Sequence, residues 1–371
     1  MIWSILIFFL VLSILVIVHE FGHYIVAKKN GILVEEFGFG LPPRIFGKKI
    51  GETLWSINLL PFGGFVKLHG ELTDPPEADK SLNKRAFLYK SKKIKIAVIV
   101  AGVVMNIILA IVAFAIVYSH YGIPKEQGFV EVVGVLPDSP ASISKIVVGE
   151  RIYAINGKEV SKKAEVTDIS SKGGKHILLV GTKDSDSKDL RKVTINTEFS
   201  EEDKRWYMGF LLSSESVYFP PVWQRPFYGV YYGVKNSFLI TKGIVTSLAG
   251  IFVKETRTEL VQGTTGPVGL LALVDNIRKQ GIYPLIDFMG LISINLAVIN
   301  ILPFPALDGG RLLFVLIEKV IGKKVIPKVE AAIHSVGMII LLGLILAITI
   351  KDIRGLISAG SISGFLENMM K

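Results

Sequence analysis

The chain has 371 residues, of which 50% are hydrophobic and 20% are charged, and its formal net charge is +10. This composition is too apolar for an ordinary soluble protein and too charged for a chain wholly inside a bilayer, so we expect a membrane protein with at least one extramembrane domain. The sequence contains no cysteine, which excludes disulfides, cysteine-based zinc sites and thiol nucleophiles and leaves histidine and carboxylate as metal ligands.

The N-terminal segment is an uninterrupted apolar run from Ile2 to Val18. A cleaved signal peptide would carry basic residues before this run, whereas Lys28 and Lys29 follow it. We therefore expect the segment to remain as the first transmembrane helix.

An HExxH motif, His19-Glu20-Phe21-Gly22-His23, directly follows the first apolar run. On a helix, histidines four residues apart project from one face and can share a metal ion, and Glu20 lies beside them to transfer protons. The alternative is a pair of interfacial histidines at the end of a membrane anchor, paired with a nearby acid. A third ligand at the same membrane depth would decide between these interpretations.

The segment after the first span has the pattern of a β-hairpin. Thr53–Leu60 alternates imperfectly, Pro61–Gly64 carries turn residues, and Phe65–Leu68 continues as a strand. Its tip is apolar, and non-helical backbone at membrane depth must be buried in protein or line a cavity, so we expect the hairpin to pack beside the HExxH motif, where an extended peptide could add to its edge. The alternative is that the hairpin only packs against the rest of the protein and binds no substrate. The candidate substrate-binding residues are Phe62, Gly63, Gly64 and Phe65.

Three further apolar segments, Ile94–Tyr118, Phe288–Leu302 and Val336–Ile350, give a total of four spans. Basic residues cluster beside the apolar segments and do not interleave with aromatic residues on a soluble face, so we expect no nucleic-acid partner. By the positive-inside rule, the connections after the first and third spans are cytoplasmic, and both termini and residues 119–287 lie on the opposite side.

The long middle region has the pattern of a separate domain. We predict strands at Phe129–Val133 and within Val148–Val160, with turn residues between them. From Phe227 to Phe252 the chain is apolar but is interrupted by Lys235 and Lys242, which favours an amphipathic helix on the membrane surface over a fifth span.

The third span ends in Asn300-Ile301-Leu302-Pro303-Phe304-Pro305-Ala306-Leu307-Asp308-Gly309-Gly310. This span runs inward, so Asp308 reaches the same cytoplasmic depth as the HExxH motif and is a candidate third ligand. Two histidines and one aspartate with an open fourth position are typical of a catalytic zinc site. Asp308 as an N-cap of a following helix, Gly309–Ile321, is the alternative interpretation, and the two roles are compatible.

Together, HEFGH in the first span and NxxPxPxLDGG in a late span resemble the site-2 protease family of intramembrane zinc metalloproteases. Residues 126–216 resemble a PDZ domain, and this arrangement is similar to the bacterial regulator-of-sigma-E protease group. The resemblance implies that His19, His23 and Asp308 bind Zn²⁺, that Glu20 is the general base, and that Asn300 positions the substrate or stabilises the oxyanion. Two other elements also match family features: Ala101-Gly102 with Asn106, and Gly266-Pro267-Val268-Gly269.

The expected fold is a polytopic α-helical membrane protein with about four transmembrane helices, a membrane-associated β-hairpin or sheet, and an inserted extracytoplasmic PDZ-like α+β domain. We divide the chain into an N-terminal membrane part (1–118), a PDZ-like domain (119–216), an amphipathic segment (217–287) and a C-terminal membrane part (288–371).

The expected function is intramembrane zinc endopeptidase activity in the cell (inner) membrane, with the active site near the cytoplasmic side. By the family resemblance, the partners are the lipid bilayer and single-span membrane proteins, such as anti-sigma factors or remnant signal peptides. The oligomeric state is left open. One alternative is a non-catalytic membrane PDZ adaptor, which would gain nothing from charged groups at membrane depth. Another is a membrane-bound HExxH peptidase of a different family, which would need hydrophilic residues around the motif.

Overall fold

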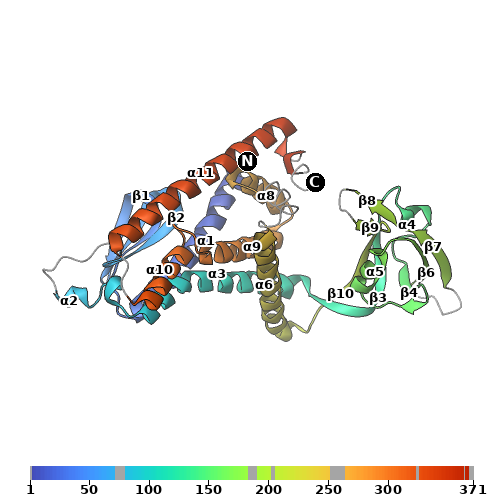
Figure 1. The fold of residues 1–371 in the computed structure, drawn as a ribbon, viewed down its shortest axis with the longest axis horizontal. Coiled ribbons are helices and arrows are strands. Elements are labelled where there is room, and N and C mark those ends of the chain that lie inside the picture. The colour runs from blue at the N-terminus through green and yellow to red at the C-terminus, as the bar shows by residue number, and fades with distance from the viewer. Residues whose placement is uncertain are drawn as a thin grey trace. The chain divides into compact units, whose positions relative to one another are not determined.

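The computed structural model of the protein describes residues 2–71, 80–182, 190–201, 205–250, 264–322, 326–362 and 364–366 (Figure 1). The chain divides into two compact units. One comprises Met1–His120 and Pro226–Lys371, and the other comprises Tyr121–Arg225. We call them the membrane unit and the inserted unit.

Four helices of the membrane unit are long and apolar enough to cross a bilayer, which confirms the predicted number of spans. They are α1 (Ile2–Lys29), α3 (Lys92–Tyr121), α9 (Ile282–Ile301) and α11 (Pro327–Ala359). The last two begin before the predicted Phe288 and Val336, because their helical structure continues into segments that carry charged residues, such as Asp287 and Glu330.

Glycines allow the long helices to approach closely. A Cβ on Gly22 of α1 would overlap the carbonyl oxygen of Ala101 in α3, and a Cβ on Gly290 of α9 would lie 2.8 Å from the ring of Phe114 in α3. Small residues are enriched where membrane helices touch, because they bring the backbones together. These contacts set α1, which carries the HExxH motif, directly against α3.

Helix α6 (Arg225–Gly250) also contacts α3, through Gly229 and Gly233. Its other face exposes large apolar side chains, among them Phe227, Tyr231 and Phe238. It is not among the candidate spans found in the described residues. Its position on the membrane surface stays a prediction, and residues 251 and 252 of the predicted helix lie outside the described residues.

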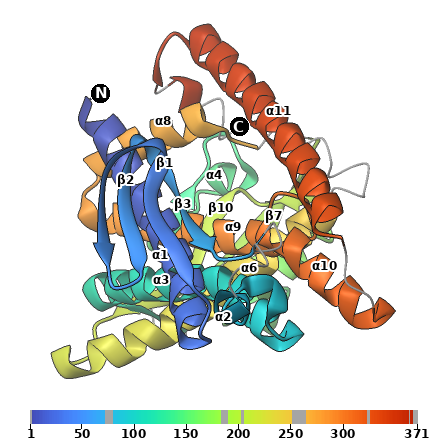
Figure 2. The same ribbon diagram turned by 90° about the vertical axis from the view of Figure 1, so that its left-hand side faces the viewer.

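A sheet formed by β1 (Val34–Ile50) and β2 (Thr53–Leu68) lies beside α1 (Figure 2). The second half of β1 pairs with the start of β2 across a tight turn, from Ile50 opposite Thr53 to Arg44 opposite Asn58. The first half of β1 has two partners: Glu36–Phe39 pairs with Leu54–Ile57 and also with Gly64–Lys67.

The predicted hairpin with a turn at Pro61–Gly64 is therefore wrong in its pairing. Its two arms, Thr53–Leu60 and Phe65–Leu68, do not pair with each other but flank the first half of β1. The turn residues do redirect the chain, since Gly63 has a φ of +83°. A turn signal, however, does not show that another strand lies between the two arms. Within the described residues, Gly64–Leu68 is consequently an edge of the sheet, which we call the edge segment.

The described residues of the membrane unit also include shorter elements. They are α2 (Lys80–Asn83), η1 (Phe87–Tyr89), α8 (Pro267–Lys279) and α10 (Asp308–Ile321).

The inserted unit is a twisted sheet with the strand order β10-β3-β4-β6-β7, and its core contains Val132, Ile152, Leu178 and Ile195. The predicted strands lie in β3 and in the β4–β5 hairpin, whose turn residues Asn156 and Gly157 both have positive φ. The strands are β3 (Ile123–Val135), β4 (Arg151–Ile155), β5 (Lys158–Glu159), β6 (Lys175–Gly181), β7 (Arg191–Asn196), β8 (Glu198–Ser200), β9 (Arg205–Tyr207) and β10 (Phe210–Tyr218), and the helical segments are α4 (Pro140–Ile143), α5 (Lys163–Ser170) and η2 (Val222–Gln224).

A buried carboxylate fastens α11 to α8. Asp352 of α11 is 2% exposed, and its Oδ2 accepts hydrogen bonds of 2.9 Å from the backbone N–H groups of Gly266 and Gly269. These N–H groups belong to the start of α8, where backbone donors lack helical partners. A Cβ on Gly266 would lie 3.0 Å from this oxygen, which explains the glycine in the Gly266-Pro267-Val268-Gly269 element.

We predict that Asp352→Ala lowers the free energy of unfolding by about 1–3 kcal/mol for each donor left unpaired, because both N–H groups stay buried. Asp352→Asn keeps an acceptor oxygen and should lose less. Thermal unfolding of the detergent-solubilised protein measures the effect, with exposed Asp168→Ala as control. An Asp352→Ala protein as stable as the control would contradict this account of the α8–α11 contact.

Candidate metal centre

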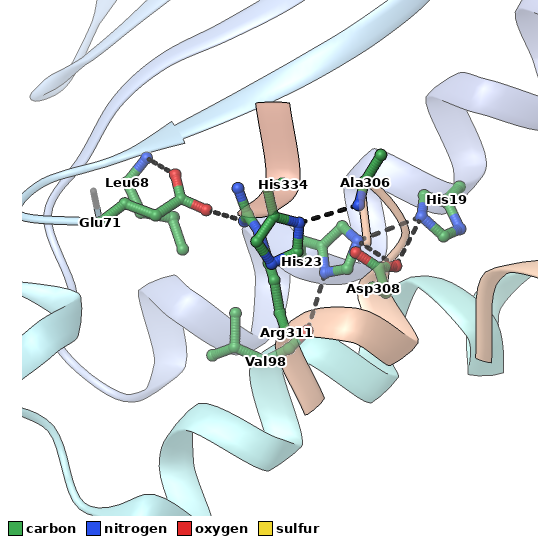
Figure 3. A network of polar contacts seen from close by, with 9 residues as sticks. All are labelled: His19, His23, Leu68, Glu71, Val98, Ala306, Asp308, Arg311 and His334. Carbon is green, nitrogen blue, oxygen red and sulfur yellow. Dashed lines mark hydrogen bonds and ion pairs between the residues drawn. The ribbon is translucent and has the colours of Figure 1, made fainter. Parts of the chain in front are cut away.

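The two histidines of the HExxH motif face each other on one side of α1 (Figure 3). Their Nε2 atoms lie 3.2 Å apart, and the side chains are 10% and 12% exposed for His19 and His23. The four-residue spacing produces this geometry, since one turn of helix separates the two residues.

Asp308 reaches the same point from the start of α10. Its Oδ2 lies 3.1 Å from Nε2 of His19 and 3.3 Å from Nε2 of His23. Asp308 is the first residue of α10 and Leu307 is the N-cap, so the N-cap interpretation of Asp308 is wrong. The carboxylate is free to face the histidines.

The glycines after Asp308 make this approach possible. A Cβ on Gly309 would overlap the carbonyl oxygens of Ile301 and Leu302, and one on Gly310 would overlap that of Phe304. The helix therefore starts directly against the segment that leaves α9. Just before it, Ala306 has a φ of +79°, an uncommon conformation for a residue with a side chain.

Each histidine has a second contact that fixes the orientation of its ring. Nδ1 of His23 lies 2.8 Å from the carbonyl oxygen of Val98, which can only accept, so Nδ1 carries a proton, and in the neutral imidazole Nε2 then carries a lone pair. Nδ1 of His19 lies 3.3 Å from the amide of fully buried Asn106. The amide oxygen of Asn106 has no partner within the described residues, and turning the amide over lets it accept from Nδ1 of His19.

In this protonation state three electron-rich atoms converge with no proton between them. Oδ2 of Asp308 is buried and has no hydrogen-bond donor within the described residues. A cation among the three atoms removes this conflict. Ligands about 2.0–2.1 Å from a tetrahedral zinc ion would be roughly 3.3 Å apart, and the observed separations are 3.1, 3.2 and 3.3 Å. The donor set therefore fits zinc.

Gly102 of α3 supplies the space behind the ligands. A Cβ at this position would overlap Nε2 of His23 and would lie 2.8 Å from Nε2 of His19. In the sequence, Gly102 and Asn106 only match a feature of the site-2 protease family. Their contacts with the histidines follow from the packing of α3 against α1.

A cavity of about 690 Å³ opens beside the three ligands. Glu20, His23 and Asp308 line it together with the edge segment and one face of α11. Its far side contains His334, whose Nδ1 accepts a hydrogen bond of 2.9 Å from the N–H of Ala306. This bond holds the turn before Asp308, a role that the sequence of α11 does not reveal.

The other predicted site residues differ in their placement. Asn300 is half-buried in the last turn of α9 and is not among the described residues that line the cavity, so its oxyanion role stays a prediction. A Cβ on Gly64 would lie 3.5 Å from Cγ of Glu20, and Phe65 lines the cavity. Gly63 faces Leu41 of β1. The side chain of Phe62 lies outside the described residues.

We predict that Gly102→Ala lowers zinc affinity by at least roughly tenfold, because the methyl group occupies the space of the histidine ligand atoms. Zinc titration of the purified full chain measures the effect. Gly243→Ala, where a Cβ meets nothing within 4 Å, is the matched control. Unchanged zinc affinity in Gly102→Ala would contradict the proposed ligand geometry.

We predict that Asn106→Ala weakens zinc binding by about 10–100-fold, because the ring of His19 loses the partner that orients it. The same titration measures this change, with Asn196→Ala at an exposed position as control. A variant that binds zinc as tightly as the wild type would show that Asn106 does not orient His19.

The match to peptidase family M50 covers residues 7–344. A relative from Clostridium perfringens, named as a zinc metalloprotease, is 34% identical over 361 residues, which cover 93% of this chain and 96% of the relative. The regulator of sigma-W protease RasP of Bacillus subtilis is 27% identical over 429 residues, which cover 95% of this chain and 99% of RasP.

Among solved structures, the PDZ domain of an SdrC-like protein from Listeria monocytogenes matches 24% of this chain and 93% of its own length, at 18% identity and a TM-score of 0.21. The family match extends from α1 into α11 and so includes all three ligand residues. The chain belongs to peptidase family M50, the site-2 protease family, and is a multi-pass membrane zinc metalloprotease.

Proposed function

We propose that this zinc metalloprotease cuts peptide bonds within the membrane-spanning segments of single-span membrane proteins. The supporting observation is the location of the ligands: His19 and His23 belong to a helix that is apolar enough to cross the membrane, and the cavity beside them runs between the edge segment and α11. An extended peptide could lie in such a cavity. A helical peptide could not react, because its carbonyl groups are shielded and already hydrogen-bonded.

Glu20 is the proposed general base. It lines the cavity beside His23 and Asp308, where it can take a proton from the attacking water and deliver it to the leaving amine. When bound by His19, His23 and Asp308, zinc supplies Lewis-acid chemistry, which polarises the scissile carbonyl and favours attack by water at neutral pH. The edge segment holds the substrate as an added strand, which keeps the reacting carbonyl exposed.

The name of one relative supports a substrate class. RasP of Bacillus subtilis is named regulator of sigma-W protease. We propose membrane-anchored anti-sigma proteins, or remnant signal peptides, as substrates of this chain. We also propose that the site opens to the cytoplasm. The PDZ-like inserted unit then lies on the extracytoplasmic side of the membrane. The lysines that follow α1, Lys28 and Lys29, support this orientation.

We predict that Glu20→Gln keeps zinc and lowers the cleavage rate by about 10²–10⁴-fold, because only the proton transfer is lost. Asp308→Ala should lose both zinc and cleavage. The test measures zinc content and cleavage of a single-span substrate by the full chain in liposomes. Full cleavage by Glu20→Gln would disprove the mechanism, and cuts only outside the substrate's span would disprove intramembrane cleavage.

A further inference from the structure

The edge segment lies across the metal centre. Its first residue, Gly64, packs beside Glu20 of the HExxH motif, and a Cβ there would lie 3.2 Å from Cγ1 of Val16. Its remaining residues, Phe65–Leu68, line the cavity that contains Asp308. One end of this short strand is thus fixed against α1 by direct contact.

The other end is fastened to the helix of the third ligand. Just after the edge segment, Glu71 forms an ion pair with Nη1 of Arg311, and its second oxygen lies 3.5 Å from the backbone nitrogen of Leu68. Arg311 lies three residues after Asp308 and therefore on the same face of α10. The side chains of Glu71 and Arg311 are 16% and 33% exposed, and both line the cavity.

The charges of this pair are maintained by their surroundings. Burial alone would lower the pKa of Arg311, but the carboxylates of Glu71 and Asp308 raise it, so the guanidinium stays protonated. Removal of either partner leaves a largely buried charge uncompensated. The ion pair therefore couples the position of the edge segment to that of Asp308.

We propose that the Glu71–Arg311 ion pair sets the register in which a substrate strand lies across the metal centre, and so determines which peptide bond is cut. This inference rests on the proposed function. Register is weakly specified in glycine-rich strands. The edge segment begins at Gly64, directly after Gly63, so this end offers a substrate strand no side chain that could fix the substrate's register. The ion pair supplies the missing restraint at the opposite end. Glu71 and Arg311 are positioning residues and take no part in the chemistry.

The absence of native cysteine allows a test that does not depend on proteolysis. In a Glu20→Gln background, Lys67→Cys places one thiol on the exposed side of the edge segment. A single-span substrate then carries one cysteine at each successive position, and disulfide formation in liposomes reports the pairing. With the ion pair intact we expect crosslinks at one main position.

The variants Glu71→Gln and Arg311→Gln should keep zinc and spread the crosslinks to positions two residues away, because a slip of two residues preserves the facing of side chains. Arg311→Lys keeps the single ion-pair contact and should keep the sharp pattern. Glu52→Gln removes a glutamate at the far turn of the sheet, paired with Lys28 and Arg85, and is the matched control.

In the corresponding proteins with Glu20 and Lys67 restored, mass spectrometry of the products should show new cuts two residues from the wild-type cut. An unchanged crosslink pattern in both Gln variants would overturn the proposal. Loss of zinc from these variants would also overturn it, because the ion pair would then only hold Asp308 in place. Absence of any preferred crosslink with the ion pair intact would also overturn it. Absence of wild-type cleavage together with a sharp, pair-dependent crosslink pattern would instead reject the proposed function and retain the role of the pair in register.

Discussion

The convergence of His19, His23 and Asp308 is the constraint on which the rest of the structure depends. Three electron-rich atoms lie 3.1–3.3 Å apart, on side chains that are largely buried. A carboxylate inside a membrane protein is costly, by about 2.5–3.5 kcal/mol at the centre of a span on insertion scales, and it needs a partner. In the proposed function, the zinc ion that would stabilise Asp308 is also the catalytic group, so one interaction would account for both the fold at this point and its chemistry.

Close backbone contacts build the centre. Gly22 lets α1 touch α3, Gly102 leaves room for the ligand atoms, and Gly309 and Gly310 let α10 begin directly after α9. The carbonyl of Val98 then orients His23. His23 and Asp308 face the cavity between the edge segment and α11, which Glu20 also lines.

The sequence was sufficient to predict the four spans and the convergence of His19, His23 and Asp308, because each depends on a short local pattern or on membrane depth. The role of Glu20 as general base stays a prediction. It was not sufficient for the sheet, since the turn signal at Pro61–Gly64 does not reveal that β1 lies between the two arms. The sequence also did not predict the contacts of Asn106, His334 and Arg311. Their partners, which are His19, Ala306 and Glu71, lie far away in the sequence. Such contacts exist only after the helices have packed.

The most direct test of the metal centre is zinc X-ray absorption spectroscopy of the loaded full chain in liposomes. We expect a zinc ion bound by two imidazoles at about 2.0–2.1 Å and by oxygen, with one imidazole lost in His23→Ala and the carboxylate oxygen lost in Asp308→Ala. A zinc spectrum unaltered by these substitutions would place the metal elsewhere and contradict the account.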